Sequence, residues 1–111
     1  MTNQWKECID ACLECASMCN QCATDCMNQS NVAELVKCIQ LNLDCANVCL
    51  SAVELMGRNS EFAERFCQLC AEICTACAEE CAKYASMNAH CKKCAEMCQQ
   101  CAEKCMAMAM A

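Results

Sequence analysis

Cysteine is the residue type with the most chemistry to offer in this chain, because nineteen of its 111 residues are cysteines spaced by helical turns. Residues 67–81 read CQLCAEICTACAEEC, in which the cysteines step by three, four, three and four residues. On an α-helix this spacing keeps every thiol on one stripe, at the a and d positions of a heptad pattern. Four such stripes together include every cysteine: Cys8, Cys12, Cys15, Cys19, Cys22 and Cys26; Cys38, Cys45 and Cys49; Cys67, Cys70, Cys74, Cys77 and Cys81; Cys91, Cys94, Cys98, Cys101 and Cys105.

These stripes fit metal binding better than the other uses of cysteine. Cysteine often serves as a small buried hydrophobe, but Ala, Val or Leu would pack as well at so many positions without the risk of oxidation. Neighbours at i and i+3 or i+4 have Cβ atoms ~5–6 Å apart, and a disulfide needs ~3.5–4.5 Å, so pairing along one helix would require strain. A redox CxxC motif occurs singly near a βαβ unit, and this sequence has no strand-like alternation. We therefore expect the thiols to bind metal.

Charge and coordination decide which metal is favoured. Iron–sulfur ferredoxins space their ligands as C-x2-C-x2-C-x3-C-P, whereas this chain has no proline and steps by helical turns. Isolated zinc sites with four thiolates each carry about −2, and several of them would accumulate negative charge in a core of low dielectric. Cu(I) is monovalent, soft and satisfied by few thiolates. At about one Cu(I) per thiolate, each ion replaces one proton and the core stays near neutral, which favours Cu(I).

Composition limits the other partners and activities. The formal net charge is −6 and the eight Lys and Arg residues form no patch, so we expect no nucleic-acid partner. The polar N-terminus does not resemble a signal peptide and no apolar run approaches membrane-spanning length, so we expect a cytoplasmic protein with no membrane partner. No nucleophile–base pair or paired catalytic carboxylates stand out, so we expect no enzyme. The glutamates are expected on solvated faces: Glu7, Glu14, Glu64, Glu72, Glu79, Glu80, Glu96 and Glu103.

The fold prediction is all-α, with residues 1–111 forming a single domain. Abundant Ala, Glu, Lys, Gln and Met, no Pro and a single Gly favour helix nearly throughout. The stripes and their breaks predict helices over residues 3–27, 32–56, 61–84 and 89–108. Four helices of similar length with short connections predict an antiparallel, up-down-up-down four-helix bundle with a cysteine-lined core.

Local signals place the ends of these helices. Asn31, with Glu34 three residues later, resembles a capping box at the start of the second helix. Gly57 stands where that helix needs a C-terminal cap. Ser60 or Asn59 is expected as the N-cap of the third helix.

The predicted topology gives the bundle two unlike ends. The turns at residues 27–31 and 84–90 lie together and bring Met27, Tyr84, Met87 and His90 to one end, which we interpret as a mouth. His90, beside Cys91, and Met87 are candidate ligands there. The opposite end is expected to be plugged by bulky apolar residues: Trp5, Leu55, Met56, Phe62, Phe66 and Met108.

The second helix differs from the others because it carries a second apolar stripe. The stripe repeats by four and three, about a quarter-turn from the thiols, and consists of Val32, Val36, Ile39, Leu43, Ala46, Leu50 and Val53. It either packs on a neighbouring helix within the monomer or mediates self-association. We predict a homo-oligomer formed through this face.

At this point the chain resembles a known family, the cytosolic bacterial copper storage proteins. The resemblance covers nearly the whole chain and rests on CxxxCxxCxxxCxxCxxxC over residues 8–26, CxxCxxxCxxCxxxC over residues 67–81 and 91–105, and the pair His90-Cys91. It implies many Cu(I) ions held by thiolates inside each bundle, assembly into a tetramer, and loading at the end that carries His90 and Met87. The family often has a histidine three residues after the last cysteine of its third helix, where this chain has Tyr84.

The sequence thus predicts a cytosolic, non-enzymatic store that holds multiple Cu(I) ions, about one per cysteine. A zinc or cadmium buffer of the metallothionein kind is the first alternative, distinguished by loading preference and stoichiometry. A thiol redox protein is the second, and it would show cycling disulfides and no metal in the purified reduced protein.

Overall fold

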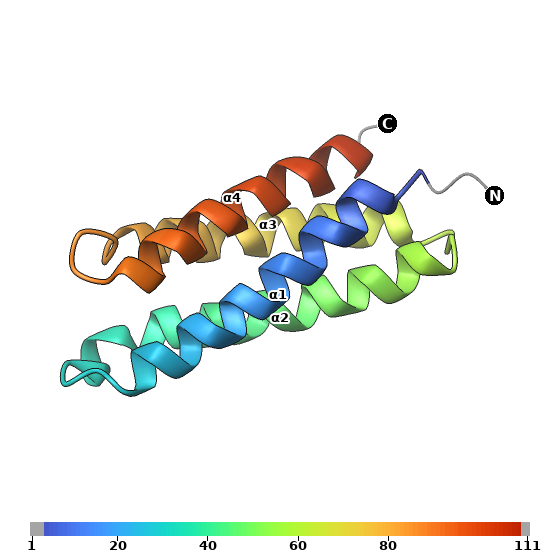
Figure 1. Cartoon of the computed structure of the whole chain (residues 1–111). Coiled ribbons are helices and arrows are strands. Elements are labelled where there is room, and N and C mark those ends of the chain that lie inside the picture. Colours follow the sequence, from blue (N-terminus) through green and yellow to red (C-terminus); the bar gives the residue numbers. More distant parts are fainter. Residues whose placement is uncertain (1–3, 110–111) are drawn as a thin grey trace.

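Four helices form an elongated antiparallel bundle in the computed structural model, which describes residues 4–109. They are α1 (Lys6–Met27), α2 (Val36–Gly57), α3 (Ala63–Ala82) and α4 (Ala89–Ala109), and a short 3-10 helix, η1 (Val32–Leu35), precedes α2. Successive helices run in opposite directions (Figure 1) within principal extents of 48 × 19 × 18 Å. The four-helix prediction is confirmed, and residues 4–109 contain no strand.

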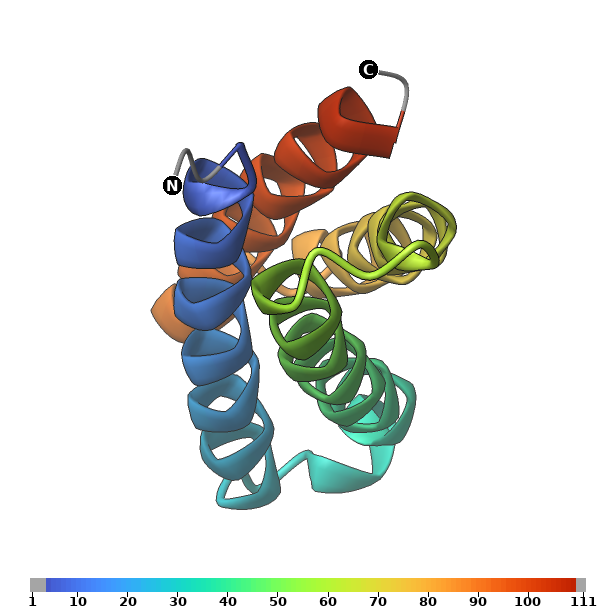
Figure 2. The same ribbon diagram turned by 90° about the vertical axis from the view of Figure 1, so that its right-hand side faces the viewer.

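The chain forms two helical hairpins that pack against each other. One hairpin is α1 with α2 and the other is α3 with α4, as the end-on view in Figure 2 makes clear. The connections at residues 28–35 and 83–88 lie at one end, here called the mouth end (Figure 1). The connection at residues 58–62 lies at the other, here called the closed end, together with the start of α1 and the end of α4.

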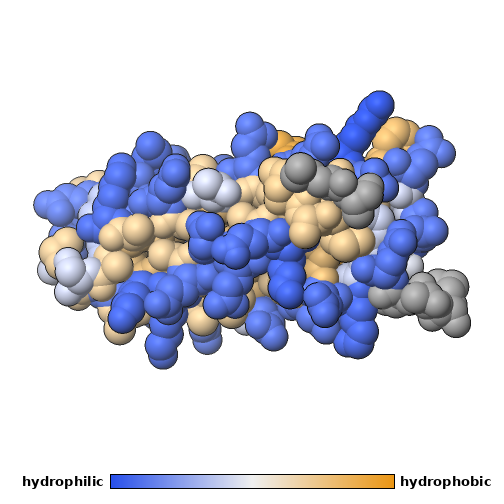
Figure 3. Space-filling model, turned by 90° about the horizontal axis from the view of Figure 1, so that it is seen from above, coloured by the Kyte–Doolittle hydropathy of each residue, from blue (hydrophilic) through white to orange (hydrophobic). Residues whose placement is uncertain are grey.

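The hairpins meet through cysteine and alanine. All nineteen cysteines are at most 1% exposed. Alanines flank them on every helix and are also buried, among them Ala16, Ala46, Ala71 and Ala102. Small side chains beside each stripe let the helix axes approach closely, so that thiols from different helices come into contact. Hydrophilic side chains form rows over much of the face seen in Figure 3.

Three predicted helix boundaries are wrong: the start of the second helix and both ends of the third, which begins at Ala63 and not at residue 61. Residues 32–35 form a 3-10 turn and not the first turn of α2, and Asn31 makes no side-chain capping bond, so the capping box is absent. The i→i+3 bond from Glu34 N to Asn31 O, 3.0 Å long, closes this tighter turn instead. At its far end α3 stops at Ala82, because residues 83–87 form turns in place of the predicted continuation to Tyr84. The predicted start of the first helix at Asn3 lies outside the described residues.

The connection between α2 and α3 also differs from its prediction. Gly57 is the last residue of α2 and does not have a positive φ; Asn59 takes the left-handed conformation, with φ 53°. The bonds Ser60 N to Leu55 O (2.9 Å) and Asn59 N to Met56 O (3.0 Å) make a Schellman motif around it. Asparagine tolerates this conformation better than most residues, so it replaces the glycine expected there. The predicted N-cap of the third helix is also wrong: Phe62 is the N-cap of α3 and no side chain caps the helix. Ser60 Oγ accepts a bond from Phe62 N within the connection.

The closed end is sealed, although not by every residue predicted. Trp5 and Met56 are buried, and Leu55, Phe66 and Met108 pack against the core. The Trp5 indole N–H donates to Asn59 Oδ1 over 3.0 Å and so ties α1 to the α2–α3 connection. Phe62 is exposed and does not belong to the plug, because α3 begins one residue after it and its side chain points away from the core.

The second apolar stripe of α2 stays largely on the surface. Ala46 is buried and Ile39 and Val53 pack partly against the core, but Val32, Val36, Leu43 and Leu50 are exposed. The alternative in which this whole face packs within the monomer is therefore wrong. Within residues 4–109, these four side chains are left largely uncovered.

Candidate metal centre

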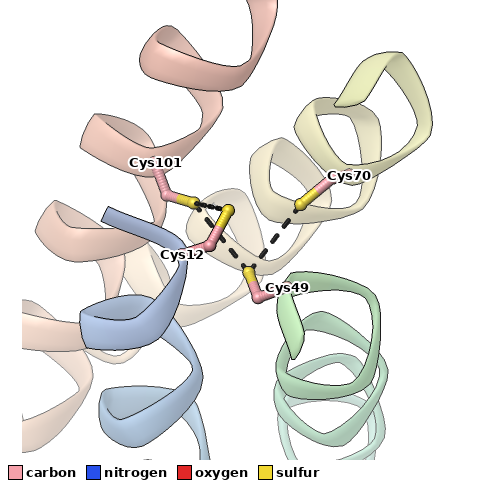
Figure 4. Close-up of side chains that lie close together, drawn as sticks. All are labelled: Cys12, Cys49, Cys70 and Cys101. Carbon is pink, nitrogen blue, oxygen red and sulfur yellow. Dashed lines mark hydrogen bonds between the residues drawn. The ribbon is translucent and has the colours of Figure 1, made fainter. Parts of the chain in front are cut away.

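The four cysteine stripes converge on the axis of the bundle. In Figure 4, Cys12, Cys49, Cys70 and Cys101 come from α1, α2, α3 and α4 respectively and point toward one another. Cys49 Sγ lies 3.8 Å from Cys70 Sγ and 3.9 Å from Cys101 Sγ, and Cys101 Sγ lies 3.6 Å from Cys12 Sγ. All nineteen cysteines are free thiols. Each helix therefore supplies one side of a column of sulfur atoms along the axis.

Sets of four ligand atoms, all within 4.8 Å of one another, follow along this axis and share members. Five cysteines each belong to two of the four sets named here: Cys15, Cys19, Cys45, Cys49 and Cys98. The sets are Cys12, Cys49, Cys70 and Cys101; Cys15, Cys45, Cys49 and Cys74; Cys15, Cys19, Cys45 and Cys98; and Cys19, Cys77, Cys94 and Cys98. Shared sulfurs make the core a continuous series of bridging positions and not a row of separate sites.

The series continues toward the closed end as far as Cys8. Cys105 Sγ lies 3.4 Å from Cys8 Sγ and 3.6 Å from Cys12 Sγ, so it joins the outermost thiol of α1 to the next one inward. Cys8 also lines a pocket with Lys104 and Met108 between α1 and α4. The predicted thiol ligands are thus in contact from one end of the bundle to the other.

At the mouth end the structure adds an imidazole to the thiols. His90 Nε2 lies 3.5 Å from Cys26 Sγ, and Cys91 Sγ lies 4.0 Å from the same sulfur. Together with Cys22 these residues form the last set of mutually close ligand atoms, here called the mouth group. Its α1 members are Cys22 and Cys26 and its α4 members are His90 and Cys91, so any ion bound there would join the two hairpins.

Met87 and Tyr84 differ from His90 in their placement. Met87 is 64% exposed, so its thioether faces solvent near the mouth, and its role as a ligand stays a prediction. Tyr84 is half-buried, and its hydroxyl donates to the backbone carbonyl of Glu34 over 3.0 Å. The phenol is therefore engaged in a contact between the two connections at this end.

Asn42 is a core residue that the search for thiols missed. It is fully buried on α2. Cys38 and Cys45 are seven residues apart, so the stripe has one position between them that is not a cysteine, and Asn42 fills it. The thiols of Cys77 and Cys94 both donate to its Oδ1 over 3.1 Å, and its Nδ2 donates to Cys38 Sγ over 3.6 Å. An amide at this position satisfies its hydrogen-bonding groups with thiols, and the unequal cysteine interval was the signal that could have identified it.

Glu80 corrects another expectation. It is 5% exposed, unlike the other glutamates assigned to solvated faces. Its Oε1 lies 3.0 Å from Lys83 Nζ and 3.8 Å from Lys37 Nζ. A buried carboxylate needs such partners, and Lys37 supplies one from the other hairpin.

Burial also sets the proton state of the thiols at the mouth. Burial, followed by the neighbouring Cys38 and Cys91, raises the pKa of Cys26 from its ordinary 9.0 to about 12. Burial is also the main cause that raises the pKa of Cys91. These thiols are protonated and neutral at pH 7, so a cation that binds them must displace protons.

Known proteins share both the sequence pattern and the fold. The sequence matches the copper storage protein family over residues 1–110. A cytosolic copper storage protein from Streptomyces lividans, solved with five coppers, superposes with a TM-score of 0.91 and 38% identity over 94% of this chain and 90% of that one. Copper storage protein 3 from Bacillus subtilis, in its apo form, gives a TM-score of 0.88 and 42% identity over 95% and 98%.

A Cu(I)-bound structure and a curated sequence complete the comparison. The Cu(I)-bound copper storage protein BsCsp3 has a TM-score of 0.89 and 43% identity over 95% of this chain and 97% of that one. The cysteine-rich protein YhjQ of Bacillus subtilis strain 168 is 44% identical over 66 residues, so the match spans 60% of this chain and 61% of that protein's length. No helix within residues 4–109 is long and apolar enough to cross a membrane.

Proposed function

This chain belongs to the copper storage protein family, and from that premise we propose that all nineteen of its core thiols are ligands for stored Cu(I), at about one ion per thiol. The observation that carries the proposal is the overlap of the four-thiol sets along the axis. Because neighbouring sets share sulfurs, each thiolate can bridge two ions. Cu(I) accepts such low-coordinate, bridged thiolate sites.

Charge supports Cu(I) over a divalent ion. Each Cu(I) that binds releases one thiol proton, so the buried core gains no net charge as it fills. Zinc bound by four thiolates would leave about −2 at each isolated site, and a buried charge of that size is strongly unfavourable. The four core sets named above consist of thiols alone, which fits the same preference, since thiolates select soft ions.

The mouth group is the proposed point of exchange with solvent. His90 is only partly buried, while Cys22, Cys26 and Cys91 beside it are buried. An imidazole nitrogen is a suitable copper ligand, and His90 is the most accessible member of the mouth group. His90 therefore receives an ion first and transfers it to the thiolates of Cys26 and Cys91, and Met87, next to it on the preceding connection, is a second candidate for transient contact.

We propose that the protein works in the cytosol as a store and not as a catalyst. The Streptomyces lividans relative is described as cytosolic. A reducing compartment keeps thiols free for Cu(I). Sequestration in the core withholds Cu(I) from exposed thiol and iron–sulfur sites elsewhere in the cell.

A homo-oligomer, specifically a tetramer, is the proposed assembly. The exposed residues Val32, Val36, Leu43 and Leu50 form an apolar face on η1 and α2 that a second copy would cover. Replacing Leu43 and Leu50 by glutamate should give a monomer in analytical ultracentrifugation, while the same double change at Leu13 and Leu69, exposed on α1 and α3, should leave the assembly unchanged. A monomeric wild-type protein would refute the proposal.

Anaerobic titration of the fully reduced protein tests the function itself. Cu(I) is added against a competing chelator, and the titration is repeated with Zn(II). Tight binding that saturates near one Cu(I) per cysteine, with far fewer Zn(II), is the expected result. Saturation with a few Zn(II) and weak copper uptake would instead indicate a zinc buffer, and binding of neither metal would favour redox chemistry.

A further inference from the structure

The two hairpins are joined at the mouth end by few polar contacts. In Figure 1 the α1–α2 and α3–α4 hairpins diverge toward this end. Outside the thiol core, the contacts that cross between them there are Tyr84 to Glu34 and Glu80 to Lys37. Inside the core, Cys38 lies against Cys81, Asn42 accepts bonds from Cys77 and Cys81, and His90 lies against Cys26. Each of these inner contacts involves a proposed copper ligand, so only the first two are independent of the metal site.

Of these two, the Tyr84 contact is the stronger. Lys37 is well exposed and its Nζ lies 3.8 Å from Glu80, so solvent screens this ion pair and it contributes little. The Tyr84 hydroxyl donates to a backbone carbonyl over 3.0 Å, and its ring packs against the core. Both contacts are open to solvent, but the partly buried Tyr84 ring is fixed against the core and so holds its hydroxyl in place, whereas the Lys37 side chain is free to move.

Tyr84 also organises the connection that leads to His90. Its backbone carbonyl accepts bonds from Met87 N, 3.1 Å, and Asn88 N, 2.9 Å. The partner on the other hairpin, Glu34, lies in η1 directly before the fully buried Leu35. One hydrogen bond therefore connects two segments that are each anchored to the core, on either side of the mouth group.

We infer that Tyr84 is a latch between the hairpins: the hydrogen bond from its hydroxyl to the Glu34 carbonyl sets the rate at which Cu(I) passes between solvent and the mouth group. Breaking this bond lets the hairpins separate locally and exposes Cys26 and Cys91. Transfer is a ligand exchange, in which the incoming Cu(I) leaves its carrier, binds a thiol sulfur, and the thiol proton goes to the carrier or to water. Once a bound Cu(I) joins α1 to α4, it holds the hairpins together itself. The latch therefore affects the rate at which the first ions bind and the rate at which the last ions leave.

This inference rests on the proposed function, but its first test needs no copper. Alkylation of the reduced apo protein by iodoacetamide is followed cysteine by cysteine with mass spectrometry. Tyr84→Phe keeps the ring and removes only the hydroxyl. Thr75→Val is the matched control, because it also removes one hydroxyl-to-carbonyl bond, Thr75 Oγ1 to Ala71 O, but within α3.

Tyr84→Phe should raise the alkylation rate of Cys26 and Cys91 by about two- to tenfold, the equilibrium value of one hydrogen bond, and Thr75→Val should not. Equal rates in Tyr84→Phe and wild type would overturn the inference. So would an equal acceleration at Cys8, Cys67 and Cys105, because it would reveal a general loosening of the bundle.

The second test measures copper directly. Excess bathocuproine disulfonate is used to withdraw Cu(I) from the fully loaded protein. The rate of the final phase of withdrawal should be higher in Tyr84→Phe than in wild type by the same factor, and the total copper bound should be unchanged. An unchanged final phase contradicts the latch. A protein that binds no Cu(I) at all would overturn the proposed function, and the alkylation result would still decide whether Tyr84 holds the mouth closed.

Discussion

The mouth end and the closed end of the bundle are built from the same cysteine stripes but are finished differently. At the closed end, Trp5 and Met56 are buried over the last thiols, and an indole–amide bond ties Trp5 to Asn59. At the mouth end, a half-exposed imidazole lies against Cys26, and outside the thiol core the hairpins are joined by one phenol hydrogen bond and a screened ion pair. In the function that we propose, the stripes determine how much Cu(I) the bundle holds, and the end residues determine how Cu(I) reaches it.

The largest expected effect comes from pH, because it acts on the thiols that both ends enclose. The folded-state pKa of Cys26, about 12, lies above its ordinary 9.0, so its contribution to apo stability is complete below pH 9 and is lost as the pH rises through 12. The apo protein should therefore unfold in this window by circular dichroism. The copper-loaded protein, with no such protons to lose, should stay folded, and parallel alkaline unfolding of both forms would contradict the protonation argument.

Removing the buried side chain of Trp5 tests whether it seals the closed end. Trp5→Ala is expected to destabilise the apo protein by about 3–5 kcal/mol, because it deletes a buried aromatic side chain. Urea unfolding followed by circular dichroism measures this loss. Phe62→Ala, at the exposed aromatic residue of the same end, should change stability by less than about 0.5 kcal/mol, and equal losses would mean that Trp5 does not seal the core.

Asn42 tests the half of the core nearer the mouth. Asn42→Ala removes an acceptor shared by Cys77 and Cys94 and should destabilise the apo protein by about 1–3 kcal/mol. Asn47→Ala, an exposed asparagine on the same helix, is the control and should be neutral or slightly stabilising. An unchanged urea midpoint in Asn42→Ala would show that the thiols there need no amide partner.

His90 provides the smallest but most specific effect. His90→Ala should slow the uptake of Cu(I) by about tenfold, equivalent to about 1.4 kcal/mol in the barrier, while capacity falls by one ion at most. Stopped-flow absorbance of the forming copper thiolates measures the rate. Lys93→Ala, an exposed change on the same helix turn, should load as the wild type does. Equal rates in His90→Ala would remove the imidazole from the route.

The periodic features of this molecule were predictable from sequence, because a stripe repeated every three and four residues requires a helix and a shared core. The burial of the thiols and the place of His90 at the mouth, beside Cys91, followed from the same periodicity and from short connections, whereas its contact with Cys26 came from the structure. The identity of the metal followed from charge rather than from any single motif.

Single-residue features were not predictable in the same way. Whether Gly57 or Asn59 takes the left-handed conformation depends on the geometry of the whole connection, including the bond from Trp5. The burial of Glu80 depends on lysines from two segments, one of them on the other hairpin. The sequence marks Asn42 only as a missing cysteine in the stripe. Its Oδ1 accepts hydrogen bonds from thiols of other helices, and no local sequence pattern predicts them.

The complete burial of the thiols affects how the cell could sense this store. On one-for-one exchange of Cu(I) for protons, the outer charge of the chain, formally −6, is the same when the protein is empty and when it is full. Native electrophoretic mobility would then hardly change with loading, although the mass increases. A partner protein that recognises surface charge could not distinguish the empty protein from the loaded one. Such a partner would have to detect the copper itself at the mouth end.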